Sequence, residues 1–342
     1  MFEDILKKLD RSRDLLLQSA NVAHFRESQE ARVLFAKQMD VLLDAERNQR
    51  RIAVMGWLSS EPSSQIQHQE LRKVRAMLPQ TTRWIFSQLQ MSAWLKCTDC
   101  TPCTFWLCGI PGAGMLFKYP YFNPSSHGFK LSQIREGKPV IFSSVIDEID
   151  ATLPDAQVIY FYCKNNDPLR SHFTDIAKSL ISQLLLLNPN CLDFVYEFML
   201  ANNECQAKDA SNLLQILGHI LANHDSLYIG IDGLDECSEE DRKLVLDLIA
   251  LGSRANDAQG NVRIIVTSRL EKDLERSLKS AAKFNIKPQN LESDITAYIT
   301  LKMSQLSQIF KFTQERMQLI TDEICTRPKG EPLFRTGFKS TC

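Results

Sequence analysis

The sequence predicts an α/β fold with a doubly wound parallel sheet, preceded by a helical N-terminal region. Short apolar runs alternate with helical patterns from about residue 104 onward, and polar residues follow each run directly. Residues 1 to about 55 instead carry apolar residues at helical spacing, with no Pro or Gly before Gly56. Strands that alternate with helices are joined by crossovers and therefore lie parallel.

Composition limits the classes of function. The chain has 342 residues, 44% of them hydrophobic, and a formal net charge of −1. That length allows one large α/β domain and a smaller helical region. The charge does not favour nucleic acid as a partner, and no run approaches the roughly 18 apolar residues that span a bilayer. With a charged start and no secretory signal, the sequence predicts an intracellular, cytoplasmic protein.

Ten cysteines in such a chain indicate reduced thiols rather than a disulfide framework. Cys97, Cys100 and Cys103 form a C-x-x-C-x-x-C run, for which a metal or iron–sulfur site is the alternative. The next cysteine, Cys108, has the wrong spacing for a fourth ligand and lies in an apolar run. Buried structural thiols are therefore favoured.

The N-terminal region, residues 1–80, is predicted as helices that contact a partner or pack on the core; both alternatives stay open. Two further helical patterns cover 66–79 and 83–95. The main domain is predicted over 81–330, and the tail 331–342 does not continue its pattern. In the main domain, the sequence predicts strands at 105–108, 158–162, 227–231 and 262–266. It predicts helices at 173–187 and 239–251.

A glycine-rich loop follows the first strand directly. It begins at Gly109 and continues with Pro111, Gly112, Ala113 and Gly114. The G-x-x-x-x-G spacing lets backbone N–H groups surround a phosphate, but a complete loop continues with Lys and then Ser or Thr. Met and Leu stand there instead, so the loop is interrupted.

The missing lysine reappears 23 residues further along. Lys138 is followed by Pro139 and an apolar helical run, and removal of 115–137 restores the loop except for its hydroxyl. The segment 115–137, with two prolines, five aromatic residues and no clean period, is predicted as loop. It is an insertion or a retained intron, because codons for residues 114–116 can spell a GUAUGU donor and Glu136-Gly137 an AG acceptor. The transcript across these codons tests that hypothesis.

Acidic residues end the third strand. Asp232 follows a buried run, and Asp235 and Glu236 come next. The first carboxylate suits Mg²⁺, and the other two suit the orientation or deprotonation of an attacking water. The alternative is an acidic turn that caps the following helix. Arg269 follows the fourth strand and is suited to a γ-phosphate, although a solvated arginine at a strand end is the alternative.

Together these motifs resemble the NACHT branch of the STAND NTPases, and in particular fungal proteins similar to the nephrocystin-3 N-terminal domain. The matching pieces are Trp57-Leu58-Ser59, C-T-x-W-L-x-G-I-P-G-A-G at 103–114, I-D-G-L-D-E-C at 231–237 and R-I-I-V-T-S-R at 263–269. The resemblance implies a P-loop NTPase fold. It also implies a switch that is closed with ADP or GDP and opened by ATP or GTP with Mg²⁺, and that self-associates in cell-death signalling.

Carried over by motif, the loop from Gly109 to Gly114 and Lys138 bind phosphate, Asp232 binds Mg²⁺, and Asp235, Glu236 and Arg269 are catalytic. A possible NTP hydrolase with an impaired phosphate loop is one reading. A non-hydrolysing interaction scaffold is the other. The interruption predicts that the printed chain binds nucleotide poorly, that deletion of 115–137 restores binding, and that Lys138→Ala abolishes it.

Overall fold

The computed structural model describes residues 2–96, 102–109, 120–123, 128–131, 137–202, 206–224, 226–258, 261–310 and 315. Contacts divide the chain into two compact units. One consists of residues 1–57 and 192–203, and the other of residues 58–191 and 204–342.

The first unit contains the helices α1 (Phe2–Leu58) and α6 (Leu192–Asn202). The sequence predicts several N-terminal helices, whereas the structure has one helix of 57 residues. Its length follows from the absence of any helix-breaking residue before Gly56. Within this unit, Arg50 joins the two helices: its Nη1 donates to Oδ1 of Asp193 at 2.9 Å, and its guanidinium lies over the ring of Tyr196.

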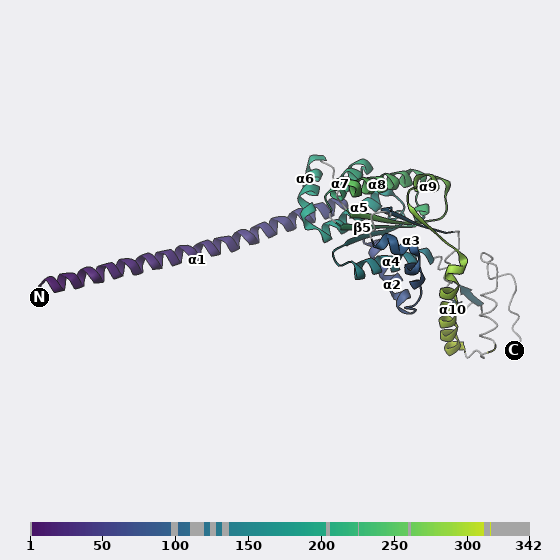
Figure 1. Ribbon diagram of the computed structural model, residues 1–342, viewed down its shortest axis with the longest axis horizontal. Helices are drawn as coiled ribbons and strands as arrows, with labels where there is room; N and C mark the ends of the chain where they lie inside the picture. Colours follow the sequence, from purple (N-terminus) through teal and green to yellow (C-terminus); the bar gives the residue numbers. More distant parts are fainter. Residues whose placement is uncertain are drawn as a thin grey trace. The chain divides into compact units, whose positions relative to one another are not determined.

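The second unit is built on a five-stranded parallel sheet (Figure 1). Its strand order is β4-β5-β6-β1-β7, and every neighbouring pair is parallel. The bounds are β1 (Thr104–Gly109), β4 (Gln157–Tyr162), β5 (Ser226–Asp232), β6 (Asn261–Ser268) and β7 (Ala282–Ile286). The predicted α/β fold with a doubly wound parallel sheet is confirmed.

Helices cover both faces of this sheet. The helices α2, α3 and α4 lie on one face and α7, α8 and α9 on the other (Figure 1). The helices of the second unit are α2 (Ser63–Ala76), η1 (Arg83–Ser87), α3 (Leu89–Leu95), α4 (Gly137–Thr152), α5 (Phe173–Leu187), η2 (Pro189–Cys191), α7 (Ala210–Ala222), η3 (Leu234–Glu236), α8 (Glu239–Ala258), α9 (Lys272–Ser277) and α10 (Pro288–Phe310).

Two sequence expectations need correction. The segment 115–137 was expected to be all loop, but β2 (Pro120–Asn123) and β3 (Gly128–Leu131) form a separate antiparallel pair. Aromatic residues favour strands there despite the nearby prolines. The pattern at 83–95 is not one helix either, because Gln88 adopts an extended backbone (φ −73°, ψ 129°) that separates η1 from α3.

The core between α4 and the sheet requires a close approach of backbone to side chains. A Cβ at Gly230 of β5 would lie 2.5 Å from Cζ of Phe142 and 2.8 Å from Cδ1 of Ile146. Both side chains come from α4 and are buried. Glycine at this position therefore lets α4 pack directly on β5.

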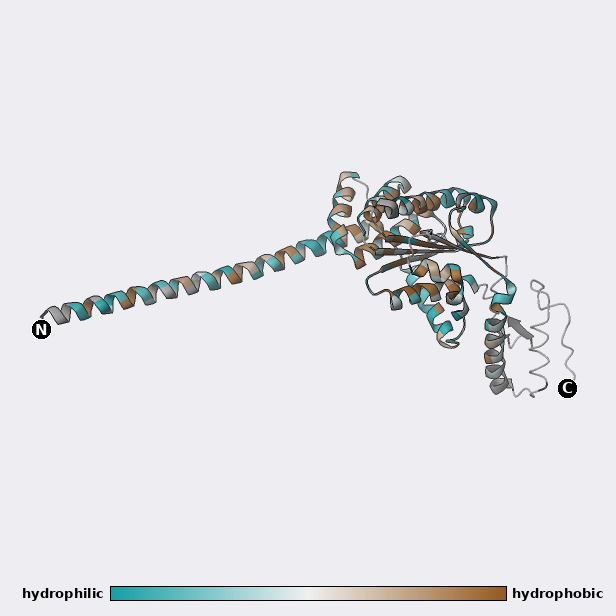
Figure 2. Ribbon diagram, in the orientation of Figure 1, coloured by the Kyte–Doolittle hydropathy of each residue, from teal (hydrophilic) through white to brown (hydrophobic). Residues whose placement is uncertain are grey.

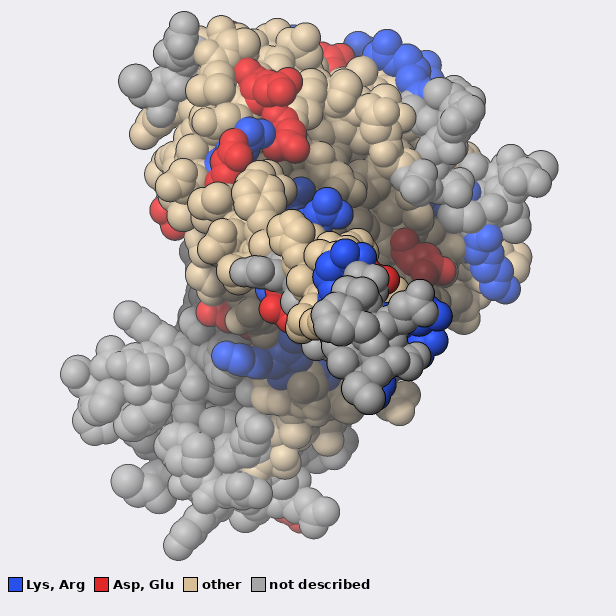
Figure 3. Space-filling view, turned by 90° about the vertical axis from the view of Figure 1, so that its left-hand side faces the viewer, with Lys and Arg blue, Asp and Glu red and all other residues tan. Residues whose placement is uncertain are grey.

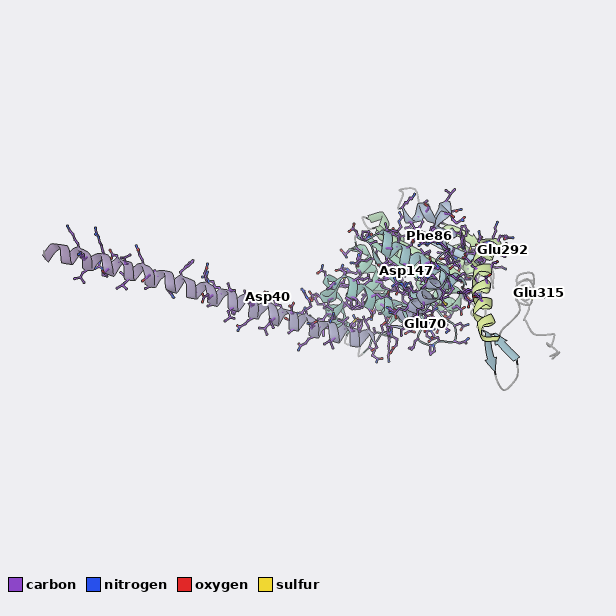
Figure 4. The ribbon with its side chains drawn as sticks, turned by 90° about the horizontal axis from the view of Figure 1, so that it is seen from below. Asp40, Glu70, Phe86, Asp147, Glu292 and Glu315 are labelled. Atoms are coloured by element: carbon purple, nitrogen blue, oxygen red, sulfur yellow. The ribbon has the colours of Figure 1, made fainter. Side chains whose placement is uncertain are left out.

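Asp147, which is labelled in Figure 4, lies on α4 and anchors α2 by charge. Its carboxylate accepts hydrogen bonds from His68 (3.0 Å), from Nε of Arg72 (2.6 Å) and from Nη2 of Arg75. The other ring nitrogen of His68 lies 2.7 Å from the hydroxyl of Tyr162 on β4. These contacts fix the position of the helix that carries Lys138.

Hydropathy agrees with this layering (Figure 2). Apolar residues line the sheet and the inner faces of its helices. Among the described residues, no single helix is long and apolar enough to cross a membrane, and one bent pair, 173–187 with 189–202, reaches that length only in combination.

Candidate functional site

The carboxyl ends of β1, β6 and β5 meet at one edge of the sheet. Leu107 pairs with Thr267, and Ile231 pairs with Val266, so that the tips of the three strands lie at nearly the same level. Because β6 separates the other two, the end of β1 at Gly109 and the acidic end of β5 lie two strand spacings apart, about 10 Å. That edge is where open parallel sheets bind ligands.

Thr267 of β6 connects this strand to the end of β5. Its hydroxyl donates to Oδ1 of Asp232 and accepts from the backbone N–H of Gly233 at 2.9 Å. Thr267 is fully buried and Asp232 nearly so. Gly233 has φ of 73°, and a Cβ there would lie 3.2 Å from the carbonyl oxygen of Cys163. The turn after β5 therefore holds the Asp232 carboxylate in one orientation.

The other two acidic residues lie on the short helix η3, next to Arg269. The backbone N–H of Arg269 donates to Oδ1 of Asp235 at 2.8 Å, and its Nε lies 3.1 Å from Oδ2 of the same carboxylate. Glu236 is 4.0 Å from Nη2 of Arg269 and accepts from the N–H of Asn165 at 3.1 Å. The side chain of Asp235 is only 7% exposed, whereas that of Arg269 is 42% exposed.

Lys138 lies at the start of α4, within the electrostatic field of these groups. Burial is the main reason that its pKa lies below the usual value of a lysine. Asp235 and then Asp232 oppose that shift, and Arg269 adds to it. The two carboxylates therefore do not offset the cost of burying this ammonium group, and a nearby anion would lower that cost.

The structure brings together five of the predicted site residues, places Gly109 at the end of β1 and does not describe the other four. Asp232, Asp235, Glu236 and Arg269 lie at the strand tips, and Lys138 at the start of α4 interacts electrostatically with Asp235, Asp232 and Arg269. Gly109 ends β1 beside Ile286 of β7. Pro111, Gly112, Ala113 and Gly114 lie outside the described residues, as do Cys97 and Cys100 of the cysteine run.

The donor set fits a magnesium nucleotide. Mg²⁺ is commonly held by one or two carboxylates together with phosphate oxygens, rather than by an all-protein cage. Asp232 would supply such a carboxylate, while Lys138 and Arg269 would supply positive charge for phosphates. Among the described side chains, no group of three or more His, Cys, Asp or Glu residues is placed to hold a metal alone.

Sequence reasoning missed two features of the site. Thr267 lies in the strand-end motif, but nothing in the pattern assigns its hydroxyl to Asp232. Cys163 and Cys237 also lie against each other beneath the acidic turn: their hydrogen bond, and then burial, raise the pKa of Cys163 well above its usual value. In the sequence, only the position of Cys237 directly after Asp235 and Glu236 pointed to this contact.

Fold and site together define an α/β protein of the P-loop NTPase class. Residues 134–269 match the family described as nephrocystin 3, N-terminal, and this region runs from α4 through Arg269. A curated relative, the vegetative incompatibility protein HET-E-1 of Podospora anserina, is 22% identical over 261 residues. That match covers 73% of this chain and 17% of the relative. The chain is thus similar to NACHT-type proteins with a nephrocystin-3-like N-terminal core, which agrees with the resemblance of its motifs.

Solved structures with some likeness to this chain include three proteins. Cdc6p from Pyrobaculum aerophilum has 11% identity and a TM-score of 0.37, over 67% of this chain and 48% of that one. A Walker-type ATPase of Pyrococcus abyssi has 14% identity and a TM-score of 0.38, over 68% and 60%. PCH-2 of C. elegans has 12% identity and a TM-score of 0.29, over 69% and 48%.

Proposed function

We propose that this chain is the nucleotide-binding core of a STAND-type signalling switch that acts in innate-immunity-like or cell-death signalling. One observation carries the proposal. Lys138, which follows the glycine loop only after a 23-residue insertion, still lies in the field of Asp235 and Asp232 at the strand tips. The name of the curated relative supports the signalling part, although this chain spans only 17% of it.

The roles follow from chemistry and position. Backbone amides from Gly109 to Gly114 and the ammonium group of Lys138 would bind the phosphates of ATP or GTP, with ADP or GDP in the resting state. Asp232, held by Thr267, would bind Mg²⁺, which supplies charge neutralisation for the phosphates. Because Asp235 is nearly buried and paired, it would orient a water molecule with Glu236 rather than move freely.

A second function, a non-hydrolysing interaction scaffold, is favoured by one residue. Pro139 follows the lysine, at the position where a hydroxyl normally reaches Mg²⁺. Without that hydroxyl, Mg²⁺ would have one protein ligand fewer. Hydrolysis would then be slow or absent, whereas nucleotide binding would persist. A chain that binds nucleotide but releases no phosphate would favour this alternative.

Titration with fluorescent ATP, ADP, GTP and GDP tests the proposal. We expect Mg²⁺-dependent binding that falls at least about tenfold in Lys138→Ala, because one phosphate-pairing cation is worth more than about 1.4 kcal/mol in such a site. Lys243→Ala, which removes an exposed lysine of α8, is the matched control. Equal binding by wild type, Lys138→Ala and the control would refute a phosphate site here.

Partners are part of the same proposal. Besides nucleotide, we propose protein contacts through the N-terminal helical region and self-association in an intracellular setting. Acidic and basic residues are mixed on the face that Figure 3 displays, and the net charge is −1, which supports the absence of a nucleic-acid partner. The division into 1–80, 81–330 and 331–342 also remains a proposal.

A further inference from the structure

Along its described side chains between residues 7 and 49, the helix α1 presents a long surface that α6, the other helix of its unit, does not cover. Nearly every described side chain between residues 7 and 49 is exposed, and α6 contacts the helix at Arg50. Side chains project on both sides of the helix in Figure 4, where Asp40 is labelled. The large apolar side chains exposed by 40% to 70% are Leu9, Leu15, Leu16, Leu17, Phe25, Val33, Leu34, Phe35, Met39, Val41, Leu42, Leu43 and Ile52.

These apolar residues follow the period of a helix. Successive residues of a helix are 100° apart, and five of these apolar side chains fall within a sector of about 40°, which we call the apolar stripe. It consists of Leu9, Leu16, Leu34, Val41 and Ile52. On its flank lies a stripe of polar residues that includes Ser12, Ser19 and Asn48. Such a division is typical of a helix that buries one side against another helix.

Three clusters make the apolar surface of α1 wider than the surface that one partner helix would bury. Residues 15–17, 33–35 and 41–43 each consist of three consecutive apolar side chains. Three consecutive positions span about 200° of a helix, whereas a two-stranded coiled coil covers only its narrow a/d stripe. Each helix therefore needs at least two neighbours to cover these clusters.

The area is large enough for a stable assembly. Thirteen large apolar side chains at such exposure present on the order of 1,000 Å² per copy, and a stable interface needs about 800 Å² from each partner. A soluble chain rarely leaves so much apolar surface without a partner.

Charge indicates what that partner is. The helix carries ten Lys and Arg and nine Asp and Glu residues, distributed along its length. A nearly neutral, mixed surface attracts neither an anionic membrane nor a strongly charged protein, but it does not repel a copy of itself. We infer that α1 is the assembly element of this chain and that three or more copies bundle through it. This inference gives a structure to the self-association in the proposed function, and so rests on it.

Sedimentation velocity of the full chain between 1 and 50 μM tests the inference. We expect the wild type to form trimers or larger species, and Leu16→Gln/Leu34→Gln/Val41→Gln to weaken assembly at least about tenfold, since each polar substitution removes apolar burial. The matched control, Arg11→Gln/Asp40→Gln/Arg47→Gln, changes three exposed residues on the polar face about 120–140° away from the apolar stripe, and it should assemble as wild type does.

Lys138→Ala separates this inference from the phosphate site. If that variant assembles normally but does not bind nucleotide, both proposals stand. A monomeric wild type, a strict dimer, or an assembly that the triple glutamine variant leaves intact would each overturn the bundle. Circular dichroism of the triple variant shows whether its core still folds: a single thermal transition close to that of wild type excludes general unfolding as the cause of lost assembly.

Discussion

Arg269 holds Asp235 at two points, through its backbone N–H at 2.8 Å and its guanidinium Nε at 3.1 Å. The first contact ties the turn after β5 to the end of β6, and the second engages the exposed guanidinium. Only the second can be exchanged for a ligand without loss of the fold. An incoming γ-phosphate would therefore compete with Asp235 for this arginine.

Arg269→Ala is expected to leave the fold intact and to reduce the discrimination between ATP and ADP. The backbone contact survives the substitution, and the lost side chain is 42% exposed, so the thermal midpoint should shift by less than about 3 °C. The ratio of ATP to ADP affinity should fall about tenfold, because only ATP presents the third phosphate. Isothermal titration with both nucleotides measures the ratio of ATP to ADP affinity, and an unchanged ratio contradicts a γ-phosphate role. Arg276→Ala, on α9, is the control and should leave this ratio unchanged.

Thr267→Val should destabilise the protein by about 1–3 kcal/mol, because it leaves the buried Asp232 carboxylate and the Gly233 N–H without the hydroxyl between them. The side chain keeps its shape, so the loss reports the hydrogen bonds. Urea denaturation measures the change. Thr267→Ser retains the hydroxyl and should recover most of the stability; a serine variant as unstable as the valine variant would point to packing instead.

The sequence predicted the sheet because each buried strand ends in residues of distinct chemistry. Gly109, Asp232 and Arg269 mark three strand ends, and parallel connectivity brings such ends to one edge. The partner of Asp232 was not predictable in this way. Which hydroxyl reaches that carboxylate depends on the register between β5 and β6, and register is set by packing across the sheet.

Other elements escaped prediction for physical reasons. The edge strand β7, Ala282–Ile286, alternates half-buried and exposed residues before the buried Ile286, and five positions are too few for a distinct period. The single helix α1 was expected as several because its apolar clusters suggest more than one packing face. The hairpin β2–β3 lies in a segment whose prolines obscure its aromatic strands.

Gly230→Ala should destabilise the protein by about 1–3 kcal/mol, because its Cβ would overlap the buried ring of Phe142 and overpacked cores cannot relax fully. The same strain should displace α4 and so weaken nucleotide binding through Lys138. Gly218→Ala on α7 is the control, since its nearest neighbour, Cδ1 of Leu251, is at an ordinary 3.4 Å. That variant should be as stable as wild type or slightly more so. Denaturant melts of both variants distinguish local overlap from a general intolerance of alanine.

Asp147→Asn should cost about 2 kcal/mol at pH 7, because it removes the charge that His68, Arg72 and Arg75 share. Burial raises the pKa of Asp147, but the hydrogen bonds from these three residues outweigh it and hold the pKa far below its usual value. A depressed pKa stabilises the folded state above the unfolded pKa, near 4, and this stabilisation is lost as the pH falls further.

The stability difference between wild type and Asp147→Asn should therefore shrink between pH 4 and pH 2. Asp150→Asn, an exposed carboxylate on the same helix, is the control and should alter stability little at either pH. Urea melts at pH 7, 4 and 3 measure all three proteins. A difference that stays constant with pH would show that Asp147 contributes through shape alone.

Deletion of 115–137 should strengthen nucleotide binding about tenfold. In the intact chain, 27 residues separate Gly109 from α4, whereas the deletion leaves five before Lys138. Ordering the longer loop on the phosphates costs more conformational entropy, and a difference of about 1.4 kcal/mol is a tenfold difference in affinity. Because Lys138 already lies near Asp232 and Asp235, the intact chain should still bind, although weakly. Titration of both proteins, each with and without Lys138→Ala, tests this: the lysine variant should abolish the gain, and equal affinity of intact and deleted chains would show that the insertion does not impede the site.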